Sequence, residues 1–202
     1  MMNKKIIIDL DGVIFEPVRE SFSRVARSEY GNIKAVAVIA AYKYGIGRVA
    51  LRGEVANVLH KCAIGARVRP GAMDALKELG NLSWVTVEFC SQVAFPENAK
   101  DLELHYRSIA PAMNVAHYEL ISPFESKRDY LYKSTGMDRH TLNYVIDSQV
   151  SNIKWPARWR TTPILLNASA HDASMARALC GARSFQDLNA FKEFLLDQQH
   201  VR

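Results

Sequence analysis

The sequence lacks the features that mark secreted, membrane-spanning and metal-cluster proteins. It contains only three cysteines, Cys62, Cys90 and Cys180, at wide spacings that form neither an even disulfide framework nor a closely spaced metal pattern. The longest apolar stretch, 35–41, is far shorter than the roughly 20 residues that a membrane-spanning helix needs. The N-terminus shows no long apolar region followed by a small-residue cleavage site. These absences predict a cytoplasmic protein without a membrane-spanning segment.

A concentrated run of basic residues is also missing. The 26 lysines and arginines exceed the 21 acidic residues and give a formal net charge of +5, but they are spread along the chain. A mild and dispersed excess fits a solvated surface and a small anionic partner better than an arm that binds nucleic acid. The composition therefore disfavours a nucleic-acid partner, and no feature of the sequence indicates an oligomeric state.

Apolar runs alternate with helical patterns along the 202 residues. The first run, 4–8, is continuous and stops at the polar turn 9–12, which is typical of a parallel strand buried on both faces. Further strands are predicted over 82–89, 117–121, 142–146 and 163–166, and helices over 71–80, 98–109, 126–133 and 188–196. This alternation predicts an α/β fold with a Rossmann-like parallel sheet and helices on both faces.

The region after the first strand has helical spacing without strand alternation. Three helices are predicted over 17–30, 33–44 and 48–62, separated by glycines. The chain would then divide into an α/β core of residues 1–15 and 68–202 and a small helical insert of residues 16–67. Basic residues of the insert could recognise the anionic part of a ligand, although most fit the solvated faces of helices. They are Arg19, Arg24, Arg27, Lys43, Arg48, Arg52, Lys61 and Arg67.

Polar residues follow the predicted strands where a parallel sheet binds ligands, beyond the carboxyl ends of its strands. In chain order they are Asp9, Asp11 and Gly12, then Ser91, then Lys127 at the start of a helix, then Asp147 and Asn152. Two carboxylates separated by one residue project to the same side of an extended segment, and such a pair suits nucleophilic and acid/base chemistry. If the substrate is a phosphate ester, its own negative charge repels an attacking nucleophile. A nearby lysine would neutralise part of that charge and so assist the attack.

The order of these residues resembles that of the haloacid dehalogenase superfamily. The resemblance lies in Ile7-Ile8-Asp9-Leu10-Asp11-Gly12-Val13, in Ser91, in Ser126-Lys127-Arg128-Asp129-Tyr130-Leu131 and in Val145-Ile146-Asp147-Ser148-Gln149-Val150-Ser151-Asn152. It implies a fold of that superfamily with the insert as a helical cap. It also implies a phosphohydrolase that acts on a small phosphate monoester, a phosphometabolite or a nucleotide, with Mg²⁺ as cofactor.

The resemblance also implies a role for each of these residues. Asp9 would be the nucleophile and form an aspartyl-phosphate, and Asp11 would be the acid and base. Lys127 would place positive charge against the nucleophile and the phosphoryl oxygens, and Ser91 and backbone amides such as that of Gly12 would donate hydrogen bonds to the substrate.

The implied metal ligands are oxygen atoms. Mg²⁺ prefers octahedral oxygen ligation and keeps several waters, so a few protein ligands suffice. Asp9, the backbone carbonyl of Asp11 and Asp147 would bind the ion, and Asn152 would orient Asp147 or contact the metal through water. Ser148 stands where many relatives carry a second acid, so this metal shell departs from the common pattern.

Some positions retain a second interpretation. The turn 9–12 could be only a polar turn or a calcium-loop fragment, but the apolar strand directly before it argues against a calcium loop. Glu88, inside a predicted central strand, could mark a strand end, a substrate contact or a buried ion pair. Thr86 could take the place of Ser91, and Lys133 that of Lys127. Asn152 could be a helix cap, and Cys90 could be a nucleophile instead of a packed residue. His171 and Asp172 could form an acid/base pair, although a helix N-terminus also explains Asp172.

Five alternative functions follow from the same residues. A dehalogenase has no need of an acid at Asp11. A phosphomutase would have to retain its phosphoenzyme until the intermediate rebinds, and the sequence does not indicate the lifetime of a phosphoenzyme. A phosphonatase would need a Schiff-base lysine from the insert, where Lys43 and Lys61 are available. A catalytically idle binding module would have no reason to retain Asp9 and Asp11 together. A phosphatase for nucleic-acid ends would show steeply salt-dependent binding.

Overall fold

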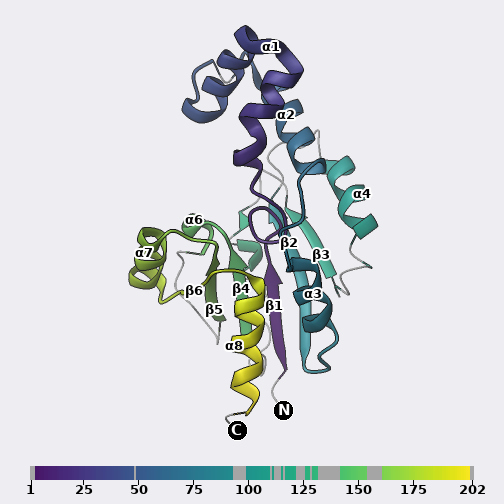
Figure 1. Cartoon of the computed structure of the whole chain (residues 1–202), viewed down its shortest axis with the longest axis vertical. Coiled ribbons are helices and arrows are strands. Elements are labelled where there is room, and N and C mark those ends of the chain that lie inside the picture. Colours follow the sequence, from purple (N-terminus) through teal and green to yellow (C-terminus); the bar gives the residue numbers. More distant parts are fainter. Residues whose placement is uncertain are drawn as a thin grey trace.

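A computed structural model describes most of the chain. The described residues are 3–47, 49–92, 99–109, 111, 115, 117–121, 126–127, 129–131, 142–153 and 161–200. They contain a six-stranded parallel sheet (Figure 1). Its strands are β1 (Lys4–Ile8), β2 (Val85–Gln92), β3 (His117–Ile121), β4 (Leu142–Asp147), β5 (Thr161–Leu166) and β6 (Arg183–Phe185).

The strand order is β3-β2-β1-β4-β5-β6, which places β1 in the middle of the sheet. Three successive isoleucines explain that position, because they are buried on alternating faces of the strand. Ile6 and Ile8 join one hydrophobic cluster and Ile7 joins the other. A strand that is apolar on both faces can be buried only where helices cover the sheet on both sides.

Helices do cover both faces, as predicted. On one face lie α3 (Ala72–Gly80), α4 (Ala99–Ile109) and α8 (Leu188–His200), and on the other α6 (Val150–Ile153) and α7 (Ala170–Cys180). Leu76 and Phe191 pack in the cluster of Ile6, whereas Ile153 and Ala176 pack in the cluster of Ile7. Among the described residues, no helix combines the length and the apolar composition needed to cross a lipid bilayer.

A pair of helices, α1 (Val18–Tyr44) and α2 (Arg52–Ile64), lies apart from the sheet. α1 contains the predicted break at Gly31, whose φ of 69° and ψ of 170° are not helical. The two helices bury a hydrophobic cluster of their own, in which the rings of Phe22 and Tyr42 stack with centroids 4.0 Å apart. Figure 1 shows this helical pair beyond the carboxyl end of β1, at the opposite end of the molecule from both termini.

Two adjacent backbone segments connect the helical pair to the sheet. Glu16 N donates to Arg67 O at 2.8 Å, and Arg69 N donates to Ile14 O at 2.9 Å. An antiparallel bridge between Phe15 and Val68 lies between these hydrogen bonds. The chain therefore leaves the sheet and returns to it at one paired crossing, between residues 14–16 and 67–69.

The structure differs from the prediction in three elements. β2 continues to Gln92, so that Ser91 lies inside the strand and does not follow it. α7 was expected only as a helix N-terminus at Asp172, because Ala176 is its one buried residue and no periodic row of large apolar side chains marks it. β6 is three residues long at the edge of the sheet, too short for an alternating pattern.

Candidate active site

Two acidic residues stand at the carboxyl ends of neighbouring strands. Asp9 follows β1 directly, and its backbone N–H donates to Ile146 O on β4 at 2.9 Å. Asp147 is the last residue of β4. Because β1 and β4 are adjacent and parallel, the two side chains lie at the same end of the sheet. Asp9 is 5% exposed and Asp147 is 1% exposed.

The ammonium group of Lys127 joins these two carboxylates. Its Nζ lies 2.9 Å from Asp9 Oδ1 and 2.7 Å from Asp147 Oδ2, and the side chain is 8% exposed. Lys127 follows Ser126, whose hydroxyl accepts a hydrogen bond from Asp129 N at 3.2 Å, as expected of a helix start. Three residues far apart in sequence are thus brought together. The competing Lys133 lies outside the described residues.

Asp147 is held by two further hydrogen bonds. Gln149 N donates to its Oδ1 at 2.9 Å, and Asn152 Nδ2 donates to its Oδ2 at 3.0 Å. Asn152 lies inside α6 and not ahead of it, so the interpretation as a helix cap is wrong. Its amide orients the carboxylate instead.

Asp11 forms a hydrogen bond with the start of the helical pair. Its Oδ1 accepts a hydrogen bond from Val18 N, the first residue of α1, at 2.7 Å. An unpaired amide at a helix N-terminus carries partial positive charge, which favours a carboxylate there. The acid two residues after Asp9 therefore rests on the segment that enters the helical pair.

Backbone carbonyls of the same loop are also held. Ser148 Oγ donates to the carbonyl oxygen of Asp11 at 3.1 Å, and Asn167 Nδ2 donates to that of Gly12 at 3.1 Å. Asn167 belongs to none of the predicted motifs. Its one signal was its position directly after an apolar strand, the same signal that marked Asp9 and Asp147.

β2 lies on the other side of β1 and carries the two candidate hydroxyl groups. Ile8 is in register with Phe89, so Ser91 lies level with the loop that follows β1, and it is buried. Thr86 is in register with Lys5, which lies four residues before Asp9, and Thr86 is exposed. The register therefore brings Ser91, and not Thr86, to the carboxyl end of the sheet.

Glu88 forms an ion pair. Lys5 Nζ lies 2.9 Å from its Oε2, and both side chains are mostly buried. This contact accounts for a charged residue in a central strand, the last of the three interpretations that the sequence allowed.

The remaining rival residues play no part in this cluster. Ser169 Oγ accepts a hydrogen bond from Asp172 N at 3.1 Å and donates to Asp172 Oδ2 at 2.8 Å, so Asp172 belongs to the N-terminus of α7. His171 is exposed on that helix. Cys90 is buried, and burial raises the pKa of its thiol to about 12, which keeps it protonated at neutral pH.

Burial and like charge shift the acidities of the site. The pKa of Asp9 is raised to about 7 by burial and, to a smaller extent, by the nearby Asp147, against the attraction of Lys127. Burial also raises the pKa of Asp11, and the Val18 hydrogen bond opposes that rise. Burial alone would lower the pKa of Lys127, but Asp9 and Asp147 more than offset it and raise that pKa. The lysine therefore stays charged, beside more acidic groups than it can neutralise.

The donor atoms of the site fit a hard divalent cation. In the described part of the chain, no three His, Cys, Asp or Glu side chains form a metal cluster. The expected ligand set does not require one, because it consists of two carboxylates, Asp9 and Asp147, and the carbonyl of Asp11. Oxygen-only ligation suits Mg²⁺ rather than zinc. A carbonyl oxygen has two lone pairs, so Asp11 can accept the Ser148 hydrogen bond and still bind a cation.

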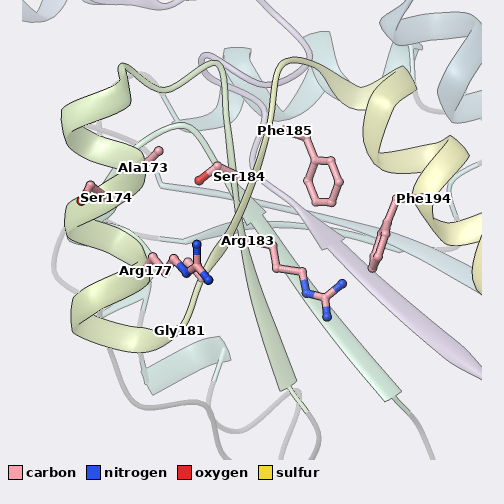
Figure 2. Close-up of a pocket in the computed structure, with 9 residues that line it drawn as sticks. Ala173, Ser174, Arg177, Gly181, Arg183, Ser184, Phe185 and Phe194 are labelled. Carbon is pink, nitrogen blue, oxygen red and sulfur yellow. The ribbon is translucent and has the colours of Figure 1, made fainter.

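A hollow of about 890 Å³ lies elsewhere, around the outer edge of β6 (Figure 2). In Figure 2, Arg177 and Ser184 lie toward α7, and Arg183 points toward Phe194 on α8. The centre of the Arg183 guanidinium lies 4.8 Å from the centroid of the Phe194 ring. None of the predicted site residues lines this hollow, so it does not belong to the candidate site.

Comparison of the whole chain with known proteins identifies its fold. No protein-family profile and no curated protein sequence matches it. Solved structures do match, and they show that the chain has the haloacid dehalogenase-like fold, as the order of its motifs predicted.

Three of these structures illustrate the similarity. A predicted phosphatase from Clostridium acetobutylicum has a TM-score of 0.65 at 10% identity, covering 98% of this chain and 100% of the other. A haloacid dehalogenase-like hydrolase from Burkholderia xenovorans LB400 has a TM-score of 0.63 at 13% identity, covering 100% of both chains. D,D-heptose 1,7-bisphosphate phosphatase from B. bronchiseptica, complexed with magnesium and phosphate, has a TM-score of 0.58 at 14% identity, covering 96% of this chain and 99% of the other.

Proposed function

We propose that this chain is a Mg²⁺-dependent phosphohydrolase that cleaves a small phosphate monoester through an aspartyl-phosphate on Asp9. The observation that carries the proposal is the buried bridge of Lys127 between Asp9 and Asp147, at the end of the sheet where this fold class binds ligands. Similarity of fold to phosphatases supports the choice of reaction.

In the first step, Asp9 attacks the phosphorus atom. A bond forms between its carboxylate oxygen and phosphorus, and the bond from phosphorus to the ester oxygen breaks. Asp11 donates its proton to the departing oxygen. The raised pKa of Asp11 suits this role, because a larger fraction of the group is protonated near neutral pH. Lys127 favours the ionised form of Asp9 that the attack requires.

In the second step, water hydrolyses the aspartyl-phosphate. Asp11, now deprotonated, takes a proton from the water as its oxygen attacks phosphorus. The bond between phosphorus and the Asp9 oxygen breaks, which restores the Asp9 carboxylate and releases inorganic phosphate. The Val18 hydrogen bond holds the Asp11 side chain, so that the same carboxyl group can act in both steps.

Other residues would bind the phosphoryl group and the metal. Lys127 would neutralise phosphoryl charge, and the Ser91 hydroxyl and the Gly12 amide would donate hydrogen bonds to its oxygens. Mg²⁺ would be held by Asp9, Asp147 and the carbonyl of Asp11, with Asn152 orienting Asp147. When bound, the ion supplies positive charge to the phosphoryl oxygens.

We assign residues 16–67 as a cap over this site. α2 of the helical pair contacts α4 of the core, where His60 Nε2 lies 3.6 Å from Asp101 Oδ2. Arg19, in the first turn of α1, lies close enough to Asp11 to lower its pKa. A cap in this position would exclude water from the phosphoenzyme, and its small size favours a metabolite or nucleotide over a protein substrate.

Two further properties accompany this function. The three cysteines are unpaired, which supports a reducing compartment, the cytoplasm. A phosphonatase is less well supported, because Lys61 is ion-paired with Glu29 and Lys43 is exposed near the end of α1. Neither lysine is in contact with the Asp9 cluster.

The experiment that tests the function measures release of inorganic phosphate. Substrates are sugar phosphates, nucleoside monophosphates and an aryl phosphate, each with Mg²⁺ and with a chelator, for the wild type and Asp9→Asn. The control is Asp74→Asn, which makes the same chemical change at an exposed position on α3.

We expect turnover that requires Mg²⁺, is abolished by Asp9→Asn and is retained by Asp74→Asn. The preferred ester would then identify the substrate class. Absence of turnover on every ester, with the wild type folded, would contradict the proposal and favour a binding module. Turnover that persists in Asp9→Asn would exclude the aspartyl-phosphate.

A further inference from the structure

The loop that follows Asp9 is held at two successive carbonyl groups from two neighbouring strands. Ser148 follows β4 and bonds the carbonyl of Asp11, and Asn167 follows β5 and bonds the carbonyl of Gly12. Both donors are side chains, and both distances are 3.1 Å. The loop of β1 is therefore fastened across the carboxyl ends of two other strands.

Gly12 allows this close approach. Its φ is +76°, a conformation that side chains with a Cβ rarely adopt. A Cβ at this position would lie 2.3 Å from Ser148 Oγ and 2.8 Å from Ser148 Cβ. The loop can lie against Ser148 only because residue 12 has no side chain.

Asn167 makes its hydrogen bond to Gly12 from a strained backbone conformation. Its φ is 55°, and within the described residues it is the one non-glycine residue with positive φ. Its backbone N–H donates to Phe185 O on β6 at 3.2 Å, so the strained residue is fixed to the edge of the sheet. Glycine would adopt this backbone without strain but could not reach Gly12. The strained backbone is therefore retained together with a side chain that can donate to the Gly12 carbonyl.

We propose that Asn167 and Ser148 are positioning residues that fix the peptide groups of Asp11 and Gly12 for binding of the metal and the phosphoryl group. The proposal rests on the proposed function. A trans peptide is planar with its C=O and N–H antiparallel, so fixing each carbonyl also fixes the next amide N–H. The carbonyl of Asp11, an expected metal ligand, and the amide of Gly12, an expected substrate donor, belong to one peptide, which Ser148 holds directly. Asn167 holds the following peptide at the Gly12 carbonyl, so the two contacts together limit rotation at Gly12. Neither Asn167 nor Ser148 needs to touch the substrate.

Two substitutions of Asn167 separate positioning from mere structural support. Asn167→Gly removes the side-chain donor and relieves the strain, whereas Asn167→Ala removes the same donor and increases the strain, because alanine tolerates positive φ less well than asparagine. If Asn167 only supports the fold, the glycine variant should behave as the wild type and the alanine variant should be impaired. If Asn167 positions the loop, both variants should be impaired alike in binding the metal.

The measurements are the Mg²⁺ concentration that gives half-maximal phosphate release, and the rise in Tm that Mg²⁺ causes without substrate. We expect both Asn167 variants to need roughly 10-fold more Mg²⁺, in the range seen when groups that orient metal ligands are removed. We also expect the metal-free Tm of Asn167→Gly to be at least that of Asn167→Ala. Ser148→Ala should raise the Mg²⁺ requirement in the same direction.

Wild-type Mg²⁺ dependence in Asn167→Gly, by both measurements, would overturn the proposal. The rise in Tm also separates this proposal from the proposed function. If the wild type binds Mg²⁺ but hydrolyses no ester, the proposed function fails, and the change in the Mg²⁺-induced Tm shift still decides the role of Asn167. A wild type whose Tm does not respond to Mg²⁺ would overturn both.

Discussion

Replacing the nucleophile Asp9 by asparagine should stabilise the metal-free protein while it abolishes turnover. Asp9 is buried with a second carboxylate, Asp147, and shares one ammonium group with it. Burial raises the pKa of Asp9 from an ordinary 3.8 to about 7. Asparagine has nearly the same shape and never ionises. It therefore removes the cost of placing a charge there, at the expense of the reaction.

The sign and the size of the effect follow from the pKa. The pKa of Asp9 is higher in the folded protein than in the unfolded chain. The free energy of unfolding therefore falls as the pH rises from the lower pKa through about 7. Each pKa unit corresponds to about 1.4 kcal/mol, so the raised pKa of Asp9 costs at most about 4 kcal/mol at about pH 8, where the folded-state group is ionised, and about 2 kcal/mol at about pH 5, where it is protonated. The advantage of Asp9→Asn should therefore grow by about 2 kcal/mol between these two pH values.

Urea unfolding in the presence of a chelator, at about pH 5 and about pH 8, measures this difference. Asp74→Asn serves as the control, because its carboxylate is exposed on α3. Saturating Mg²⁺ should reverse the order at the higher pH, because the carboxylate of ionised Asp9 binds the cation more strongly than the neutral amide of asparagine does. Two results would refute this account of the buried carboxylates. One is an Asp9→Asn variant that is less stable than the metal-free wild type at about pH 8. The other is a difference in unfolding free energy between variant and wild type that is the same at both pH values.

Three further predictions follow from contacts in the same cluster. Lys127→Met should lower the metal-free unfolding free energy by about 3–5 kcal/mol, because it leaves Asp9 and Asp147 buried without a counter-charge, and urea unfolding with a chelator measures it. Asp11→Asn should slow phosphate release from alkyl esters by roughly 100-fold or more but affect aryl esters less, since an acidic phenol leaves with little protonation; equal losses on both would contradict an acid role. Gly12→Ala should cost about 2–4 kcal/mol in urea unfolding, through its positive φ and the clash with Ser148. Gly45→Ala, which also has positive φ but open space around it, should cost about 1 kcal/mol, so equal losses for the two glycines would exclude the clash.

The fold could be predicted where strands are continuous apolar runs. The run 4–8 is β1 as the structure shows it, because only a central parallel strand buries three successive isoleucines. The same reasoning did not find β6, which has three residues and one sheet neighbour. Nor did it find the length of α7, where small alanines replace the large apolar side chains that reveal a helix by their spacing.

The position of the candidate site could be predicted from the ends of the strands, but its internal contacts could not. Polar residues after the runs at β1 and β4 had to lie together once those strands proved adjacent and parallel. The sequence does not indicate which way each side chain turns. Asp11 accepts the Val18 amide instead of joining Lys127, and that choice depends on where the chain enters α1.

Asn167 shows why such a contact escapes sequence reasoning. Its side chain reaches a carbonyl 155 positions away, and the partner is a backbone atom that every residue possesses. Neither spacing nor residue type can identify that partner. The informative quantity is the backbone conformation, since a φ of 55° at a non-glycine residue is costly and persists only when surrounding contacts hold it. Here those contacts are a hydrogen bond to β6 on one side and the Gly12 carbonyl on the other, so the strain marks the point where the edge of the sheet is connected to the loop of the nucleophile.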